Sequence, residues 1–210
     1  MLCHHSNWLP LPEVVARALQ TAAYAHRLQL RKGMDLPYIV HPYSVGMMLH
    51  NAGCSDAVVA AGLLHDVPED TAVNLTTLRS DFGEHIAMIV GFCTEDKGMS
   101  WEARKARAIE KFRAAPLEVK LVAAADKLDN LRSIIAEHRR VGEQVWERFN
   151  RGREKQAWFY YEVATSLATN IPPEGDGQLF ALLCAEVEAF FGEKNGTSQH
   201  DHHRNALRKP

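Results

Sequence analysis

The 210-residue sequence lacks most features of secreted, membrane-embedded or nucleic-acid-binding proteins. Its four cysteines include no Cys-x-x-Cys pair, which argues against a disulfide framework and against a thiolate zinc site. No apolar run approaches the roughly 20 residues of a membrane span, and residues 1–12 have no signal-peptide pattern. The formal net charge of −2 gives no overall attraction to nucleic acid or membrane. We therefore expect a cytoplasmic protein that binds neither.

Sustained alternation of apolar and polar residues, the pattern of a half-buried strand, is also missing. Apolar residues recur at helical spacing instead, and they make up 46% of the sequence, enough for a full hydrophobic core. The sequence therefore predicts an all-α helical bundle forming a single domain over residues 1–191. From Gly192 onward the chain turns polar and loses periodicity, so residues 192–210 are predicted to be a disordered tail.

Capping residues and helix breakers set the predicted helix boundaries. Ser55, Asn74 and Ser100 are good N-caps because their side chains can accept hydrogen bonds from the first turn. Gly53 is expected to stop one helix, and Gly83 to separate two others. The predicted helices cover residues 12–30, 42–52, 56–67, 75–82, 84–93, 101–114, 116–138, 142–150, 153–169 and 176–191.

An apolar helix that ends in the adjacent pair His65 and Asp66 carries the strongest chemical signal. Two further carboxylates, Glu69 and Asp70, follow within four residues of this pair. Histidine and aspartate are good ligands for a divalent cation. Adjacent helical positions point about 100° apart, close enough to reach one ion at a helix end. The alternative is that His65 and Asp66 simply pair near the helix C-terminus, where a cationic histidine is favoured.

Asp126 follows a second apolar run and shares a helix face with Asp129 and Asn130, three and four residues further on. A buried carboxylate needs a partner, which is either a metal ion or a nearby lysine or arginine. His41 precedes Pro42, and this placement biases its backbone toward an extended conformation at a helix start. A lone histidine of this kind is more often structural than functional, so His41 gains weight only beside the other signals.

Taken together, His41, the His65-Asp66 pair and Asp126 resemble the HD superfamily, in which such residues bind a divalent metal inside a helical bundle. More narrowly, the sequence resembles the hydrolases of guanosine tetra- and pentaphosphate in RelA/SpoT-type enzymes and the small alarmone hydrolases. The resemblance spans about residues 20–135 and leaves 140–191 as a helical C-terminal extension. The matching segments are Ala25-His26, Arg31-Lys32, Pro37-Tyr38-Ile39, His41-Pro42, Leu63 to Thr71, Phe82-Gly83 and Ala125 to Ser133.

The resemblance implies a role for each matching residue. It implies one divalent metal ion, Mn²⁺ before Mg²⁺, Fe²⁺, Co²⁺, Ni²⁺ or Zn²⁺, held by His41, His65, Asp66 and Asp126. It implies that Glu69 and Asp70 order or activate the attacking water. It also implies substrate binding by Arg31, Lys32, Asn130 and Ser133. Beside these we expect Tyr38 to bind substrate, and Lys105 in the predicted helix 101–114 to reach a phosphate. For the basic ones, a solvated surface charge is the alternative, and for Arg31-Lys32 this would favour the dipole of the preceding helix.

The implied reaction is metal-dependent hydrolysis of a guanosine 3′,5′-bis(diphosphate)-type alarmone to a guanosine 5′-diphosphate and pyrophosphate. The sequence departs from the family at Leu28-Gln29, at Pro68 and at Asp129-Asn130, mostly near the parts that read the nucleotide. A second hypothesis is therefore an HD phosphohydrolase acting on another phosphorylated nucleotide, such as NADPH or a nucleoside monophosphate. A third is a non-catalytic nucleotide sensor. Helical bundles of this size often dimerise, so a homo-oligomer is also a hypothesis.

Overall fold

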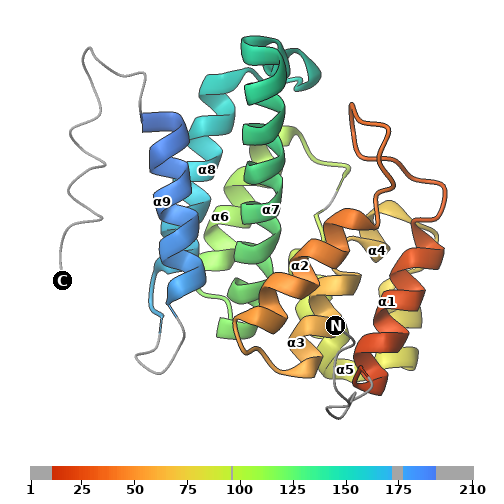
Figure 1. Ribbon diagram of the computed structural model, residues 1–210. Coiled ribbons are helices and arrows are strands. Elements are labelled where there is room, and N and C mark those ends of the chain that lie inside the picture. The colour runs from red at the N-terminus through yellow and green to blue at the C-terminus, as the bar shows by residue number, and fades with distance from the viewer. Residues whose placement is uncertain (1–10, 96, 172–176, 193–210) are drawn as a thin grey trace, which may run out of the picture. The chain divides into compact units, whose positions relative to one another are not determined.

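A computed structural model describes residues 11–95, 97–171 and 177–192. These residues fall into two compact units, one within residues 1–31 and 35–94, the other within 32–34 and 95–210. In the described ranges every regular element is a helix, apart from one isolated antiparallel bridge between Leu30 and Pro37 (Figure 1). The all-α prediction is confirmed. The single domain over residues 1–191 stays a prediction.

The first unit is built around a short apolar helix, α3 (Asp56–Leu64), which packs against α1, α2 and α5. Every residue from Val58 to Leu64 is buried, because a helix that is apolar on all sides needs neighbours all round. A Cβ atom at Gly62 would overlap the side chain of Leu49 on α2, so α2 and α3 approach closely. The other helices of this unit are α1 (Glu13–Ala25), α2 (Val40–Asn51), α4 (Val67–Asp70) and α5 (Leu75–Cys93).

The predicted N-caps are confirmed in both units. The backbone N–H groups of Val58, Thr77 and Ala103 donate to the side-chain oxygens of Ser55, Asn74 and Ser100, at 3.4, 3.0 and 3.3 Å. These bonds satisfy first-turn donors that have no partner inside the helix. The two helices predicted on either side of Gly83 follow each other directly in α5. The backbone of Gly83 is not helical, with a φ of +84°, and α5 is therefore kinked at this glycine.

Two predictions about the segment before α2 are wrong. The first helix ends at Ala25 rather than at residue 30. His41 is not extended but lies in the first turn of α2. Its N–H donates to Tyr38 O at 2.9 Å, and the missing N–H of Pro42 falls where a helix needs no internal partner. The hydrogen bond from His41 to the residue three positions earlier thus outweighs the usual preference of a residue before proline for an extended backbone.

The second unit is organised around the longest helix, α7 (Leu117–Val141), which packs against the two following helices, α8 and α9. Figure 1 shows α7 in green alongside α9 in blue. The segment predicted as a helix over residues 142–150 is a 3₁₀ helix, η1 (Gly142–Arg148), which begins at a glycine with a φ of +63°. The remaining helices are α6 (Trp101–Arg113), α8 (Arg153–Ala168) and α9 (Gln178–Gly192).

The C-terminal predictions are tested only in part. Gly192 is the last residue of α9, whereas the predicted disordered tail otherwise lies outside the described residues. Most of the gap between the predicted helices 153–169 and 176–191 lies outside them as well. In the described ranges, no helix combines the length and the apolar character that a membrane crossing requires.

Candidate metal and catalytic site

Two buried histidines from neighbouring helices meet one carboxylate oxygen in the first unit. His41 lies in the first turn of α2, and His65 is the C-cap residue of α3. Their Nε2 atoms lie 3.4 and 3.1 Å from the same oxygen, Oδ2 of Asp66. The two side chains are only 1% and 2% exposed, and their ring centroids lie 5.1 Å apart. The structure thus brings together three of the four predicted metal ligands.

A hydrogen bond on the far side of the ring fixes the orientation of His65. Its Nδ1 lies 2.7 Å from the backbone oxygen of Gly62. A carbonyl oxygen only accepts, so Nδ1 must carry a proton and donate it to Gly62. Nε2 is then the ring nitrogen that faces Asp66. Histidine ligands of metal ions are commonly oriented by such a bond from the other ring nitrogen.

Asp66 is held from a second direction by Tyr38. The Tyr38 hydroxyl donates a 2.6 Å hydrogen bond to Oδ2 of Asp66, the oxygen that also faces the two histidines. Asp66 is itself the N-cap residue of α4. Two imidazole nitrogens and a carboxylate oxygen form a donor set that suits a borderline divalent cation. The residues present in this unit therefore fit a metal ion.

The two predicted catalytic acids, Glu69 and Asp70, lie on the single turn of α4, close in sequence to Asp66. The backbone N–H of Asp70 donates to the Asp66 carbonyl at 3.0 Å, which ties the acids to the predicted metal ligand. Glu69 is half-buried and Asp70 is exposed. Gln29 donates from its side-chain nitrogen to Oδ2 of Asp70 at 3.2 Å.

Asp126, the fourth predicted ligand, lies on α7 in the second unit and is 9% exposed. Its carboxylate accepts hydrogen bonds from Lys127 Nζ at 2.6 Å and from Asn130 Nδ2 at 2.5 Å. The lysine partner that the sequence left as an alternative is therefore present. Burial alone would lower the pKa of Lys127, but the charges of Asp126 and Glu95 raise it above its ordinary value.

Lys105, a predicted substrate-binding residue on α6, pairs with Glu95. Its ammonium donates to Glu95 Oε1 at 2.7 Å and lies 4.7 Å from the centroid of the Phe159 ring. Burial and the charge of Lys127 lower the pKa of Lys105, although Glu95 opposes this shift. Burial would raise the pKa of Glu95, but Lys105 and Lys127 lower it. The carboxylates of Asp126 and Glu95 thus share cationic neighbours within this unit.

The other predicted substrate-binding residues lie in the loop before α2 and on α7. The Arg31 N–H donates to Leu36 O at 2.9 Å. Lys32 is exposed, and its carbonyl accepts a 3.5 Å hydrogen bond from Arg148. Ser133 is half-buried on α7, three residues after Asn130 and therefore on the same side of that helix.

Four residues that contact the predicted site residues have no role predicted from the sequence. His26 and Gln29 lie behind Asp70 in the first unit, whereas Glu95 and Lys127 surround Lys105 and Asp126 in the second. The adjacency of Lys127 to Asp126 is a sequence signal for its ion pair. The spacing of three between His26 and Gln29 is compatible with a local contact but does not reveal their link to Asp70.

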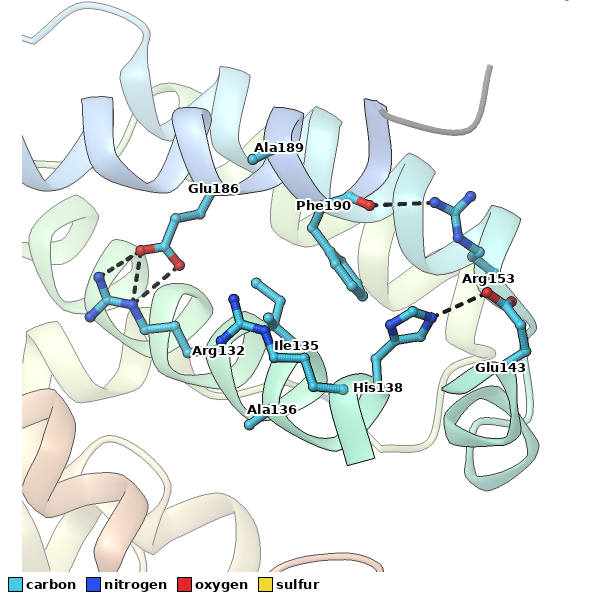
Figure 2. Close-up of a pocket in the computed structure, with 10 residues that line it drawn as sticks. Arg132, Ile135, Ala136, His138, Glu143, Arg153, Glu186, Ala189 and Phe190 are labelled. Carbon is cyan, nitrogen blue, oxygen red and sulfur yellow. Dashed lines mark hydrogen bonds and ion pairs between the residues drawn. The ribbon is translucent and has the colours of Figure 1, made fainter. Parts of the chain in front are cut away.

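A separate groove of about 590 Å³ lies in the second unit, where side chains of α7 face α9 (Figure 2). Arg132 bridges it by donating to both oxygens of Glu186 on α9, and His138 faces Glu143 at 3.2 Å. The bond to Glu186 raises the pKa of Arg132. Among the described residues that line this groove, none is a predicted site residue.

Comparison with known families agrees with this arrangement. A family model described as an HD domain matches residues 18–154, more than half of the chain and parts of both units. The chain therefore belongs to the HD domain family.

The chain is similar to two curated proteins and one solved structure that, by their names, act on or make guanosine polyphosphates. A GTP pyrophosphokinase of Streptomyces coelicolor is 40% identical over 124 residues, 57% of this chain and 14% of the relative. The guanosine-3′,5′-bis(diphosphate) 3′-pyrophosphohydrolase MESH1 of Drosophila melanogaster is 38% identical over 119 residues, 55% of this chain and 66% of the relative. A solved structure of a metazoan ortholog of SpoT that hydrolyses ppGpp matches with a TM-score of 0.70 at 29% identity, covering 87% of this chain and 97% of that one. The chain thus spans less than two thirds of the length of the first two relatives.

Proposed function

We propose that this chain is a metal-dependent phosphohydrolase that converts guanosine 3′,5′-bis(diphosphate)-type alarmones to a guanosine 5′-diphosphate and pyrophosphate. The observation that carries the proposal is the convergence of His41 Nε2 and His65 Nε2 on one oxygen of Asp66. Beside this triad stand the two acids of α4, in a chain of the HD domain family. The relatives support the choice of substrate, because two of them are hydrolases of this alarmone.

The proposed metal ligands are His41, His65, Asp66 and, from the second unit, Asp126. Mn²⁺ is the proposed ion, because a mixed histidine and carboxylate donor set accepts it readily. When bound, such an ion lowers the pKa of a coordinated water and polarises a phosphoryl oxygen. Asp126 already accepts from Lys127 and Asn130, and these bonds would hold the carboxylate in one orientation for the ion.

Glu69 and Asp70 are the proposed acid–base residues. Their carboxylates orient the attacking water toward the 3′ phosphorus and accept its proton, a role that commonly contributes about 10²- to 10⁴-fold in rate. Their place on the turn that follows Asp66 supports this role, since the backbone bond from Asp70 to Asp66 couples the acids to the metal ligand.

The proposed nucleotide contacts combine cations with hydrogen-bonding side chains. Arg31 and Lys32 would bind the phosphates and the guanine, and Lys105 would exchange part of its pairing with Glu95 for a phosphate. The Tyr38 hydroxyl donates to Asp66, so a contact of Tyr38 with substrate would use its ring. Asn130 and Ser133 would line the nucleotide pocket from one side of α7.

A purified sample supplied with Mn²⁺ and guanosine tetraphosphate tests the proposal through pyrophosphate release. Asp126→Ala should abolish release and lower the amount of Mn²⁺ retained. The exposed Asp81 on α5 provides the matched control Asp81→Asn, which should behave as wild type. Wild-type protein that retains Mn²⁺ but releases no pyrophosphate contradicts the alarmone assignment.

A second candidate is hydrolysis of another phosphorylated nucleotide, such as NADPH or a nucleoside monophosphate. The observation in its favour is the sequence Asp129-Asn130, which departs from the alarmone hydrolases at a position next to a proposed nucleotide contact. The same assay with these nucleotides distinguishes the two, because phosphate rather than pyrophosphate would be released. Size-exclusion chromatography of the same samples tests whether the chain forms a homo-oligomer.

A further inference from the structure

The segment between α1 and α2 contacts Asp70 on α4 through side chains that the proposed reaction does not use. His26 Nδ1 lies 2.6 Å from Gln29 Oε1, and Gln29 Nε2 lies 3.2 Å from Asp70 Oδ2. His26 is only 1% exposed, whereas Asp70 lies at the surface. A buried ring is thus connected, through one amide, to a carboxylate that faces solvent.

The chemistry of these groups fixes the direction of each hydrogen bond. An ionised carboxylate only accepts, so the group of Gln29 that faces Asp70 must be its NH₂. The amide oxygen of Gln29 therefore faces His26, and the imidazole proton must lie on Nδ1. His26 Nε2 is buried and has no hydrogen-bond partner among the described residues, so Nδ1 is the ring nitrogen through which His26 acts on Gln29.

His26 is itself fixed by its neighbours. Its ring packs against the ring of Tyr38 with centroids 4.9 Å apart. Backbone bonds reinforce this contact, since Gln29 N donates to His26 O at 2.9 Å and Tyr38 N donates to Gln29 O at 2.8 Å. Through Tyr38 the same segment also holds Asp66, four residues before Asp70. Together with the backbone bond from Asp70 N to Asp66 O, the contacts form a closed circuit from His26 through Asp70 and Asp66 and back through Tyr38.

We propose that Gln29 and His26 are positioning residues for Asp70: Gln29 fixes the Asp70 carboxylate, and His26 fixes the Gln29 amide. The inference rests on the proposed function, in which Asp70 orients the attacking water. Asp70 is exposed on a four-residue helix, and the hydrogen bond from Gln29 restrains rotation about its side-chain bonds. A neutral amide restrains the Asp70 carboxylate and leaves its negative charge in place. An arginine or lysine at the position of Gln29 would neutralise that charge.

Steady-state kinetics with Mn²⁺ and guanosine tetraphosphate test the role of Gln29. Because misplacement of a reacting group by about 1 Å can cost on the order of 10²-fold in rate, Gln29→Ala should lower kcat by about 10-fold or more. KM and Mn²⁺ affinity should change by less than about 2-fold, since the proposed phosphate contacts and metal ligands remain. Gln29→Glu keeps the shape but turns a carboxylate toward Asp70, so it should lower kcat further. The exposed Gln20 on α1 supplies the control Gln20→Ala.

Substitutions of His26 test whether His26 fixes the Gln29 amide. Asn places an amide N–H near the position of Nδ1, so His26→Asn should retain more of kcat than His26→Phe, which keeps a ring but has no donor. The double variant His26→Phe with Gln29→Ala should lose no more kcat than Gln29→Ala alone, because both act through one carboxylate. If the loss in kcat of the double variant equals the product of the two single losses, the two substitutions act independently. That result would overturn the proposal that His26 acts through Gln29.

A measurement without substrate separates this inference from the proposed function. Long-range ¹H–¹⁵N correlation spectra should show the His26 ring as the Nδ1–H tautomer, and Gln29→Ala should shift that signal while leaving the signal of the exposed His50 unchanged. Absence of turnover by wild type overturns the proposed function and with it the role of Asp70. Wild-type turnover together with an unaffected kcat for Gln29→Ala overturns the positioning role alone.

Discussion

The hydroxyl of Tyr38 donates a 2.6 Å hydrogen bond to Oδ2 of Asp66, the oxygen that lies 3.1 Å from His65 Nε2. Tyr38 enters from the loop before α2, whereas Asp66 follows α3, so this bond ties two separate segments at the proposed metal site. A hydroxyl that donates to a ligating carboxylate restrains its rotation. Tyr38 can therefore act on the metal site whether or not its ring also contacts a nucleotide.

Tyr38→Phe removes this donor and keeps the ring that packs against His26. Loss of a partner to a metal ligand typically costs about 10- to 100-fold in metal affinity or activity, so Mn²⁺ affinity should fall within that range. Isothermal titration calorimetry with Mn²⁺ measures the change. Tyr43→Phe, at a 48% exposed position on α2, is the matched control. Equal Mn²⁺ affinities for wild type and Tyr38→Phe would show that the hydroxyl is not needed to hold Asp66.

Glu69→Gln removes a proposed acid–base carboxylate and leaves the three ligands of the first unit intact. The variant should retain Mn²⁺ and lose about 10²-fold or more in kcat, because proton transfer in the transition state is lost. Metal analysis of the purified variant and pyrophosphate release measure the two effects on one sample. A variant that also loses Mn²⁺ would instead place Glu69 among the metal ligands.

The helix starts could be predicted from sequence because their chemistry is local. Ser55 accepts from an N–H only three residues away, and the same holds for Asn74 and Ser100. The conformation of His41 was predicted wrongly because the preference of a residue before proline competes with bonds to Tyr38 O and other carbonyls of the preceding turn. The backbone conformation is decided by the balance between such local preferences and hydrogen bonds, and the sequence alone does not give that balance.

The composition of the candidate site was predictable, whereas its supporting contacts were not. His65 and Asp66 are adjacent in sequence, so their joint use could be expected. The bonds from Gln29 to Asp70 and from Tyr38 to Asp66 join residues 41 and 28 positions apart. They depend on how the loop before α2 returns toward α4, which no spacing rule for helices describes. Lys105 likewise looked available for a phosphate until Glu95, ten residues earlier, was found beside it.

Glu95→Gln should weaken the pH dependence of stability in acid. The cations Lys105 and Lys127 overcome the effect of burial and lower the folded-state pKa of Glu95 below its ordinary value of 4.5. Below about pH 4.5 the unfolded chain then binds more protons than the folded one, so this stabilisation is lost as pH falls through the folded pKa. Urea unfolding at about pH 6 and about pH 4 should show a smaller difference between wild type and Glu95→Gln at the lower pH. A constant difference would mean that Glu95 has the same pKa in both states.

Gly62→Ala should destabilise the packing that brings the two histidines together. The new Cβ would overlap the Leu49 side chain, and both residues are buried, so α2 and α3 would have to separate. Overpacking of this kind costs about 1–3 kcal/mol. Gly91 on α5 offers the control, because a Cβ there meets Leu75 only at 3.5 Å. Gly91→Ala should be stabilising by up to about 1 kcal/mol through helix propensity. Since His41 and His65 lie on the two separating helices, Gly62→Ala should also weaken Mn²⁺ binding, which calorimetry on the folded variant measures. Reduced stability with unchanged Mn²⁺ affinity would show that the histidines do not depend on this close approach.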